Sequence, residues 1–430
     1  MTKPNVLIIA EAANPEWVSV PLVGWSLATA LQRATGGHIV TQIRNKDAFL
    51  RAGMVEGEDF TAIDSEAVAS PFYKASTLLR GGAGKGWTTN TAIDALAYPY
   101  FEHLIWKQFG DDIKKGAYDI VHRITPLSPT IASPIAKKCA RHGVKFVMGP
   151  MNGGIPWPSG FDAERRREKE WLSYVRNAYK LLPGRMGMVK AASAIVAGSQ
   201  HTRGEYPDAY KDKYFYIPEN AIDPERFSLC REYNDNDEVP LRVCFIGRMV
   251  PYKGPDMLLE AATPLLKAGK LHIDMIGDGP LMPDLRAMIE GTTAEDAVTF
   301  HGWQDHKKVQ EIAVVSSLLA FPSVREFGGG VVLEAMALGV VPLIVDYGGP
   351  GELVSEKTGY KVPIGSREDI VAQFGAMLSA LAGDPSALPD MGKAARRHVF
   401  DKLTWDKKAE QIIDIYEWTL DREKEKPQAF

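Results

Sequence analysis

One stretch of the chain, residues 321–339, carries the residue types and spacing best suited to chemistry. Its three consecutive glycines, Gly328 to Gly330, predict a turn, because each costs about 1 kcal/mol relative to alanine inside a helix. A helix should begin near Val331 and end at Gly339, which can adopt the left-handed conformation of a C-terminal cap. The free backbone N–H groups and the positive dipole of such a helix start form an anion site.

Two carboxylates flank this predicted anion site. Glu326 precedes the glycines, and Glu334 is placed about one turn inside the helix. Carboxylates only accept hydrogen bonds, so they suit hydroxyl groups rather than phosphate. A ligand with both phosphate and polyol parts, such as a nucleotide sugar, would fit a site that combines anion-binding N–H groups with carboxylates. The alternative interpretation is an ordinary strand–turn–helix connection with a solvated pair of glutamates.

Two cations follow the predicted strand at residues 242–247. Arg248 and Lys253 lie in the loop at the carboxyl end of that strand, where open α/β sheets bind their ligands. Arg can hold a phosphate with two hydrogen bonds, and Lys adds a mobile charge. The pair could therefore neutralise a diphosphate without a metal ion. Two ordinary surface cations are the alternative.

The elements that must position these residues alternate between short β-branched runs and longer helical patterns, which is typical of a doubly wound parallel sheet. Twelve strands are predicted in two sets of six. The first set is Val6–Ala10, His38–Ile43, Ile120–Ile124, Lys145–Met148, Ala194–Ala197 and Tyr214–Ile217. The second set is Arg242–Gly247, His272–Gly277, Val298–His301, Leu318–Phe321, Pro342–Val345 and Tyr360–Val362.

Each set of strands suffices for one Rossmann-like sheet, so we expect two α/β domains of that kind. The first domain should span residues 1–220 and the second residues 241–404. The polar residues 221–240 between them predict a linker. Residues 405–420 show helical spacing of apolar residues, and the predicted fourth segment, 405–430, comprises this helix and a charged tail.

Composition excludes several classes of protein. The 430 residues carry a net charge of −4, divided as +6 over residues 1–220 and −10 over the remainder, so neither half is basic enough to indicate nucleic-acid binding. Three scattered cysteines exclude a disulfide scaffold and a C-x-x-C zinc site. We find no export signal and no apolar stretch of the length that spans a bilayer. These features predict a cytoplasmic protein.

The motifs of the second half resemble a known family. They are Gly247-Arg248 with Lys253-Gly254, the run Gly277-Asp-Gly-Pro280, and Glu326 separated by seven residues from Glu334. In order and spacing they are similar to the signature of retaining GT-B glycosyltransferases of family 4, the glycosyl transferases group 1. The resemblance covers nearly the whole second half.

This resemblance implies a GT-B fold, with two Rossmann-like domains facing across a cleft and a C-terminal helix that crosses back to the first domain. It implies that Glu326 holds the transferred sugar, that Glu334 binds the ribose hydroxyls and that no cofactor or metal is needed. The turn at residues 301–303 would lie near the nucleobase. The implied donor-binding residues are Arg248, Lys253, Phe327, Gly328, Gly329, Gly330, Val331, Glu334, Gly24, Gly247 and Gly277.

The first half departs from the family pattern. Relatives have a Gly-Gly turn after the first strand, whereas here Val23 precedes Gly24. His122 matches a strand-end histidine that contacts the donor sugar in relatives, so it is predicted as catalytic alongside Glu326. The second histidine of the pattern is replaced by Ile124. A structural role for a lone histidine at a strand end is the alternative.

The resemblance implies transfer of a hexosyl or uronosyl group, with retention, from a nucleoside diphosphate sugar to a lipid or glycan hydroxyl. The donor nucleotide is expected to be UDP rather than GDP. Glycolipid synthesis and polysaccharide assembly are the two settings considered. A nucleotide-sugar epimerase or hydrolase on the same fold, and a sugar-binding protein without catalysis, remain the alternatives.

Residues 160–190 carry eight basic and four acidic side chains interleaved with aromatic residues. One helical face carries Trp171, Tyr174, Val175, Ala178 and Leu182. Such a helix could lie on an anionic membrane surface, which would place the protein on the inner face of the cytoplasmic membrane. A helix that packs on the core with a solvated basic side explains the pattern equally well.

Overall fold

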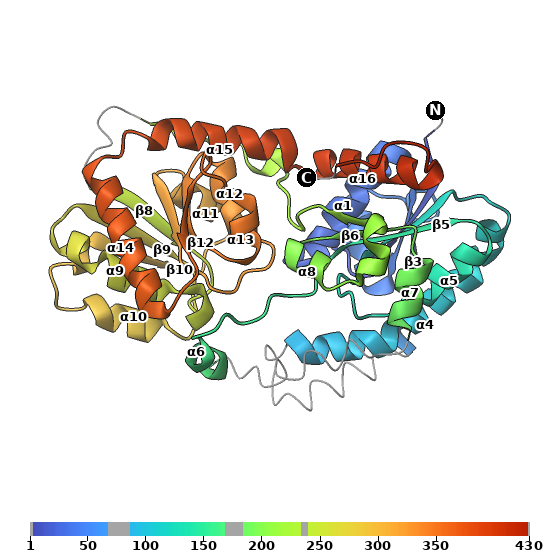
Figure 1. The fold of residues 1–430 in the computed structure, drawn as a ribbon, viewed down its shortest axis with the longest axis horizontal. Helices are drawn as coiled ribbons and strands as arrows, with labels where there is room; N and C mark the ends of the chain where they lie inside the picture. Colours follow the sequence, from blue (N-terminus) through green and yellow to red (C-terminus); the bar gives the residue numbers. More distant parts are fainter. Residues whose placement is uncertain (1–2, 68–86, 168–183, 234–239, 429–430) are drawn as a thin grey trace. The chain divides into compact units, whose positions relative to one another are not determined.

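The structure, a computed structural model, forms two compact units (Figure 1). Unit 1 comprises residues 1–154, 170–219 and 405–430, and unit 2 comprises residues 155–169 and 220–404. The residues described are 3–67, 87–167, 184–233 and 240–428. The aromatic face predicted within residues 168–183 therefore lies outside them.

Unit 1 is built on a seven-stranded parallel sheet with the order β3-β2-β1-β4-β5-β6-β7. All five residues of β1 are buried, as expected for a parallel strand covered by helices on both faces. The strands are β1 Val6–Ala10, β2 His38–Gln42, β3 Phe60–Ile63, β4 Ile120–Thr125, β5 Lys145–Met151, β6 Ala194–Ala197 and β7 Tyr214–Tyr216. The α-helices are α1 Val20–Thr35, α2 Lys46–Arg51, α4 Trp87–Lys114, α5 Pro134–Arg141, α7 Arg185–Ala191, α8 Gln200–Gly204 and α16 Trp405–Leu420.

Unit 2 is built on a six-stranded parallel sheet with the order β10-β9-β8-β11-β12-β13. The strands are β8 Leu241–Ile246, β9 Leu271–Ile276, β10 Val298–Gly302, β11 Leu318–Phe321, β12 Val341–Asp346 and β13 Tyr360–Pro363. The α-helices are α6 Asp162–Arg167, α9 Pro255–Lys267, α10 Met282–Ile289, α11 His306–Ala313, α12 Gly330–Ala337, α13 Gly348–Leu353, α14 Arg367–Gly383 and α15 Leu388–Lys402.

All twelve predicted strands are present, but the sequence analysis missed β3. This strand is only four residues long and lies at the edge of its sheet, where Ile39 to Gln42 pair with Phe60 to Ile63. Its only β-branched residues are Thr61 and Ile63, so its strand signal is weak. The expectation of two Rossmann-like parallel-sheet domains is confirmed.

Residues 155–169, which the sequence analysis placed in the first domain, belong to unit 2. Phe161 is buried in the hydrophobic core of that unit. The carbonyl oxygen of Ile155 accepts a hydrogen bond from Arg325 Nε (3.2 Å), and that of Pro156 accepts one from the Tyr347 hydroxyl (3.0 Å). These contacts between residues distant in sequence explain why local composition did not reveal the assignment.

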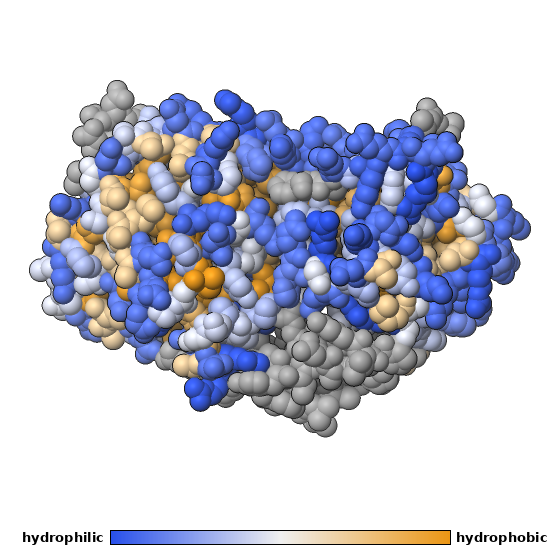
Figure 2. Space-filling view, viewed as in Figure 1, coloured by the Kyte–Doolittle hydropathy of each residue, from blue (hydrophilic) through white to orange (hydrophobic). Residues whose placement is uncertain are grey.

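The C-terminal helix α16 returns to unit 1, as expected, and packs beside α1 (Figure 1). Its Ile412, Ile415 and Tyr416 are buried, whereas Leu420 is exposed. No helix among the residues described is long and apolar enough to cross a bilayer. On the face drawn in Figure 2, hydrophilic residues cover most of the surface and apolar residues show between them.

The strand order of each sheet reverses direction at one place. In unit 1 the reversal lies between β1 and β4, and in unit 2 it lies between β8 and β11. Open α/β sheets bind their ligands outside the carboxyl ends of the strands at such a switch point. A ligand site is therefore expected in the loops after these four strands.

Candidate functional site

The chain segments at the ends of β8, β9 and β10 in unit 2 are joined by close backbone contacts beside the switch point. Gly277 N donates to the carbonyl of Gly302 (2.9 Å), and Met249 N donates to that of Asp278 (3.0 Å). A Cβ atom on Gly277 would lie 2.0 Å from the carbonyl oxygen of Gly247, so no larger residue fits there. Gly277 thus lets the loops after β8 and β9 approach each other, and Gly247 has a positive φ (154°) that favours glycine.

Lys253 is held at the centre of this edge of the sheet. It ends a 3₁₀ turn, Pro251–Lys253, which is followed by Gly254 in the left-handed conformation (φ 70°). Its ammonium group lies 5.1 Å from the ring centre of Phe321 and forms an ion pair with Glu326 Oε2. The Lys253 side chain is only 13% exposed, so the structure brings these two predicted site residues together in a largely desolvated place.

Arg248 directly follows this Gly247 and is exposed. Within the described ranges its guanidinium group has no hydrogen-bond or ion-pair partner. An unpaired guanidinium can bind an oxyanion with two hydrogen bonds.

The glycine turn and the helix after it have the predicted form. Gly329 is left-handed (φ 58°) and caps α12, which starts at Gly330, one residue before the predicted start. Gly339 is also left-handed (φ 77°), as predicted. In the described part of the chain, the N–H groups from Phe327 to Val331 have no acceptor, and the first N–H of α12 to be bonded is that of Val332. These free donors lie at the positive end of the helix dipole.

Glu326 is fixed by its backbone as well as by its ion pair. Its carbonyl oxygen accepts a hydrogen bond from Gly349 N (3.0 Å) in α13. A Cβ atom on Gly349 would lie 2.0 Å from the carbonyl oxygen of Phe327, so the turn packs directly on the start of α13. The carboxylate therefore has a defined direction before any ligand binds.

Glu334 lies one turn inside α12, is partly buried, and contacts a histidine that was not predicted as a site residue. His306 Nε2, at the start of α11, is 3.5 Å from Glu334 Oε1. The histidine also contacts Gln310 one turn later in α11. The i, i+4 spacing of these two polar residues was the available signal.

The segment that joins β10 to α11 is anchored by a buried carboxylate. Asp274 in β9 accepts hydrogen bonds from His301 Nε2 (2.7 Å) and Arg242 Nη2 (3.0 Å). Burial by itself raises the pKa of Asp274, but the hydrogen bonds from His272, His301 and Arg242 outweigh it and hold the pKa below its usual range. Asp274 thus stays ionised and fixes the end of β10.

His122 in β4 is completely buried, and both of its ring nitrogens are used inside unit 1. Nε2 donates to the carbonyl of Gly149 (2.8 Å), so Nδ1 accepts from the Tyr416 hydroxyl (2.5 Å). These contacts favour the structural role over the predicted catalytic one. Burial lowers the pKa of His122 to about 4, against a smaller opposing effect of the Gly149 carbonyl.

The buried His122 should make unit 1 sensitive to acid. Its pKa is about 4 in the folded chain, below the value near 6.5 of an exposed histidine, so the unfolded chain binds more protons between these pH values. Stability should fall by about 2 kcal/mol from pH 7.5 to pH 5 through this group. Urea unfolding across this range should show a shallower loss for His122→Gln. The exposed His103→Gln is the control, and an unchanged slope in His122→Gln would refute the assignment.

Gly24, predicted to bind the donor, does not lie in a turn after the first strand. It lies inside α1, where a Cβ atom would be 2.0 Å from the carbonyl oxygen of Ala12. The loop after β1 therefore packs directly on the helix at this glycine. The close approach at Gly24 is therefore between the backbone of α1 and the carbonyl of Ala12.

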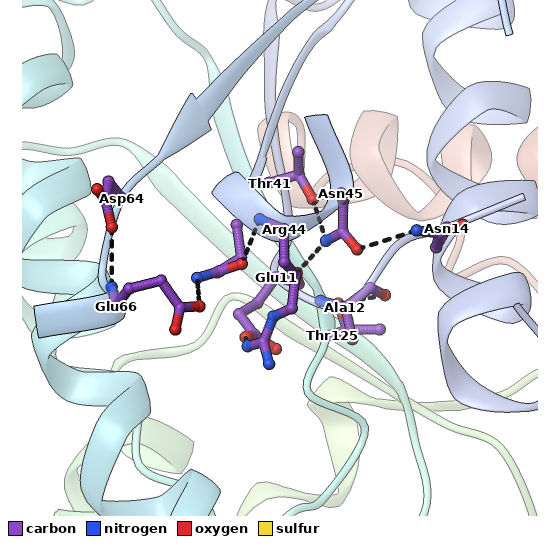
Figure 3. A network of polar contacts seen from close by, with 10 residues as sticks. Glu11, Ala12, Asn14, Thr41, Arg44, Asn45, Asp64, Glu66 and Thr125 are labelled. Atoms are coloured by element: carbon purple, nitrogen blue, oxygen red, sulfur yellow. Dashed lines mark hydrogen bonds and ion pairs between the residues drawn. The ribbon is translucent and has the colours of Figure 1, made fainter. Parts of the chain in front are cut away.

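A polar network that was not predicted lies beside the switch point of unit 1 (Figure 3). Arg44 Nη2 contacts Glu11 Oε1 (2.5 Å), and Gln42 Nε2 donates to Glu66 Oε1 (2.5 Å). The buried amide of Asn45 also donates a hydrogen bond to the carbonyl of Glu11 (2.8 Å). The network joins the ends of β1, β2 and β3. It could not be predicted from a short sequence motif, because its residues come from separate segments of the chain.

Known structures resemble the whole chain. A glycosyltransferase from Rickettsia africae matches with a TM-score of 0.61 at 16% identity, over 98% of this chain and all of the other. Anabaena HepE, solved in complex with UDP, matches with a TM-score of 0.58 at 14% identity, over 96% of this chain and 99% of the other. Together with the two parallel sheets, these likenesses define a protein of the GT-B fold.

The sequence comparisons are more specific over unit 2. Residues 230–398 match the family of glycosyl transferases group 1. A D-inositol 3-phosphate glycosyltransferase from Gordonia bronchialis is 32% identical over 186 residues, which is 40% of this chain. The matched part spans 39% of that relative's length.

Proposed function

We propose that the chain is a retaining glycosyltransferase that moves a hexosyl or uronosyl group from a nucleoside diphosphate sugar to a hydroxyl of a lipid or glycan. The observation that carries the proposal is the convergence of Lys253 and Glu326 at the switch point of unit 2, beside the free N–H groups at the start of α12. Cations and amides would bind the diphosphate, and carboxylates would bind the hydroxyls of the sugar and ribose.

The family match and the fold likeness support this proposal. Anabaena HepE, which shares the fold, was solved with UDP, and this supports UDP as the donor nucleotide. During transfer the acceptor oxygen would bond to the anomeric carbon on the face from which the diphosphate departs. The bond from that carbon to the diphosphate oxygen would break, and the departing oxygen would take the proton of the acceptor hydroxyl.

We infer that the polar network of unit 1 in Figure 3 binds the acceptor. The Glu11–Arg44 pair offers an acceptor and a donor side by side, which suits a hydroxyl. Glu11→Gln should raise the acceptor KM about tenfold with UDP affinity unchanged, because one charge-assisted hydrogen bond is lost. Steady-state kinetics with Glu16→Gln as the matched control would measure it. A wild-type acceptor KM in Glu11→Gln would contradict this role.

The proposed mechanism uses Arg248, Lys253 and backbone amides to neutralise the diphosphate, so it assigns no step to a metal ion. Initial rates measured with excess EDTA should equal those with added Mg²⁺ or Mn²⁺. A loss of activity in EDTA that a divalent metal restores would overturn this part of the proposal.

The decisive experiment for the function is a screen of UDP-, GDP- and ADP-sugars by thermal shift, followed by assays of the best donor with glycan and lipid acceptors. A donor present at one hundred times its dissociation constant adds about 2.7 kcal/mol of stability. Formation of an α-linked product from an α-linked donor would support retention. Release of nucleoside diphosphate without an acceptor, at the same rate as with one, would favour a hydrolase. Binding of the donor without turnover would favour a sugar-binding protein.

A further inference from the structure

The start of α11 places two polar side chains on one face of the helix. Asp305 caps the helix by accepting hydrogen bonds from Lys307 N and Lys308 N (both 3.0 Å). The cap makes His306 the first helical residue and puts Gln310 one turn later on the same side. Gln310 is buried at 7% exposure, so its amide requires hydrogen-bond partners inside the protein.

The partners of Gln310 fix the orientation of its amide. Gln310 Nε2 donates to the carbonyl oxygen of Arg226 (2.8 Å), and that oxygen can only accept. The same nitrogen lies 3.1 Å from His306 Nδ1. Because the amide nitrogen carries two N–H bonds, its second proton points to the imidazole, and Nδ1 must be the acceptor.

The orientation of the amide determines the tautomer of the histidine. With Nδ1 accepting, the proton of the neutral imidazole is on Nε2, which faces Glu334 Oε1 at 3.5 Å. The ring is held from the side by Phe227, at 5.1 Å between ring centres and 87° between ring planes. Across the described ranges, Glu334 Oε2 has no hydrogen-bond partner.

We propose that His306 is a positioning residue that directs Glu334 toward the ribose hydroxyls of the donor. The inference rests on the proposed function and adds to it a chain of hydrogen bonds from the Arg226 carbonyl through Gln310 and His306 to Glu334. Fixing one carboxylate oxygen with an N–H donor leaves the other to accept from the ribose. A carboxylate oriented in advance loses less rotational freedom when the nucleotide binds.

The test is a calorimetric comparison of two probes, UDP and 2′,3′-dideoxy-UDP, on the full chain. In His306→Phe, which keeps an aromatic ring beside Phe227 but has no N–H, UDP binding should weaken about tenfold, the size of one lost charge-assisted hydrogen bond, while binding of the dideoxy analogue stays unchanged. His306→Gln retains an N–H donor and should recover most of the loss. In a Glu334→Ala background, His306→Phe should have no further effect. Lys307→Ala, the exposed neighbour, is the control.

The possible results separate the inference from the proposed function. Equal weakening of both probes in His306→Phe, or no weakening of either, overturns the positioning role while the proposed function stands. Wild-type protein that binds UDP and its dideoxy analogue equally overturns the ribose role of Glu334 and the inference with it. Wild-type protein that binds no nucleoside diphosphate overturns the proposed function itself.

Discussion

Glu326→Ala is expected to lower kcat by about a thousandfold or more, because the proposed function places this carboxylate at the reacting sugar, where a group fixed in advance acts mainly on the transition state. Nucleotide affinity should not fall with it. In the structure the Glu326 carboxylate is paired with Lys253, so a bound diphosphate must compete with Glu326 for that ammonium. Removing the carboxylate should leave UDP binding equal to or tighter than that of the wild type. Product formation at saturating donor and calorimetry with UDP would measure the two effects.

Two further variants control for this result. Glu326→Gln keeps the size of the side chain and removes its charge, so it should show the same loss of kcat. Glu356→Gln changes an exposed carboxylate of the same unit and should behave as wild type. A Glu326→Ala enzyme whose kcat remains within about tenfold of wild type would refute the assignment, since removal of a transition-state contact costs more than that.

Much of the fold could be predicted because parallel strands covered on both faces are continuous apolar runs. β1 and β12 are of this kind, and both were located to within a residue at each end. β3 escaped because an edge strand of four residues is specified by its partner β2 more than by its own sequence. Residues 155–169 were misplaced for a similar reason, since their anchors, Arg325 and Tyr347, are far away in sequence.

The arrangement of the candidate site in unit 2 could be predicted because its parts are local in sequence. The glycine turn, Glu326 and Glu334 lie within one strand–turn–helix segment, and the ends of β8 and β11 meet because those strands are neighbours. In unit 1 the residues that contact His122 and those of the polar network come from separate segments of the sequence. The partner that occupies His122 is Tyr416, 294 residues away, and Glu11 meets Arg44 through the pairing of β1 and β2. A single residue type at a strand end cannot reveal which groups surround it.

Lys253→Ala and Arg248→Ala should each weaken UDP binding by roughly ten- to a hundredfold, because a charge-assisted hydrogen bond contributes about 1.5–3 kcal/mol. Binding of uridine, which has no phosphate, should be unchanged. Lys357→Ala, an exposed lysine of the same unit, is the control. Calorimetry at two salt concentrations should also show that the UDP affinity of both variants depends less on salt than that of the wild type, since each variant lacks one contact with the anionic diphosphate.

The two cations should nevertheless respond differently to a second substitution. Lys253 is largely buried and paired with Glu326, so Lys253→Ala leaves that carboxylate without its cation where the diphosphate would bind. Part of the loss in Lys253→Ala is therefore repulsion by Glu326, and Glu326→Gln in the same chain should restore part of the UDP affinity. Arg248 is exposed and has no such carboxylate partner in the described residues. Adding Glu326→Gln to Arg248→Ala should therefore raise the UDP affinity by no more than Glu326→Gln raises it in the wild type. Additive effects in both pairs would show that the ion pair is not part of the diphosphate site.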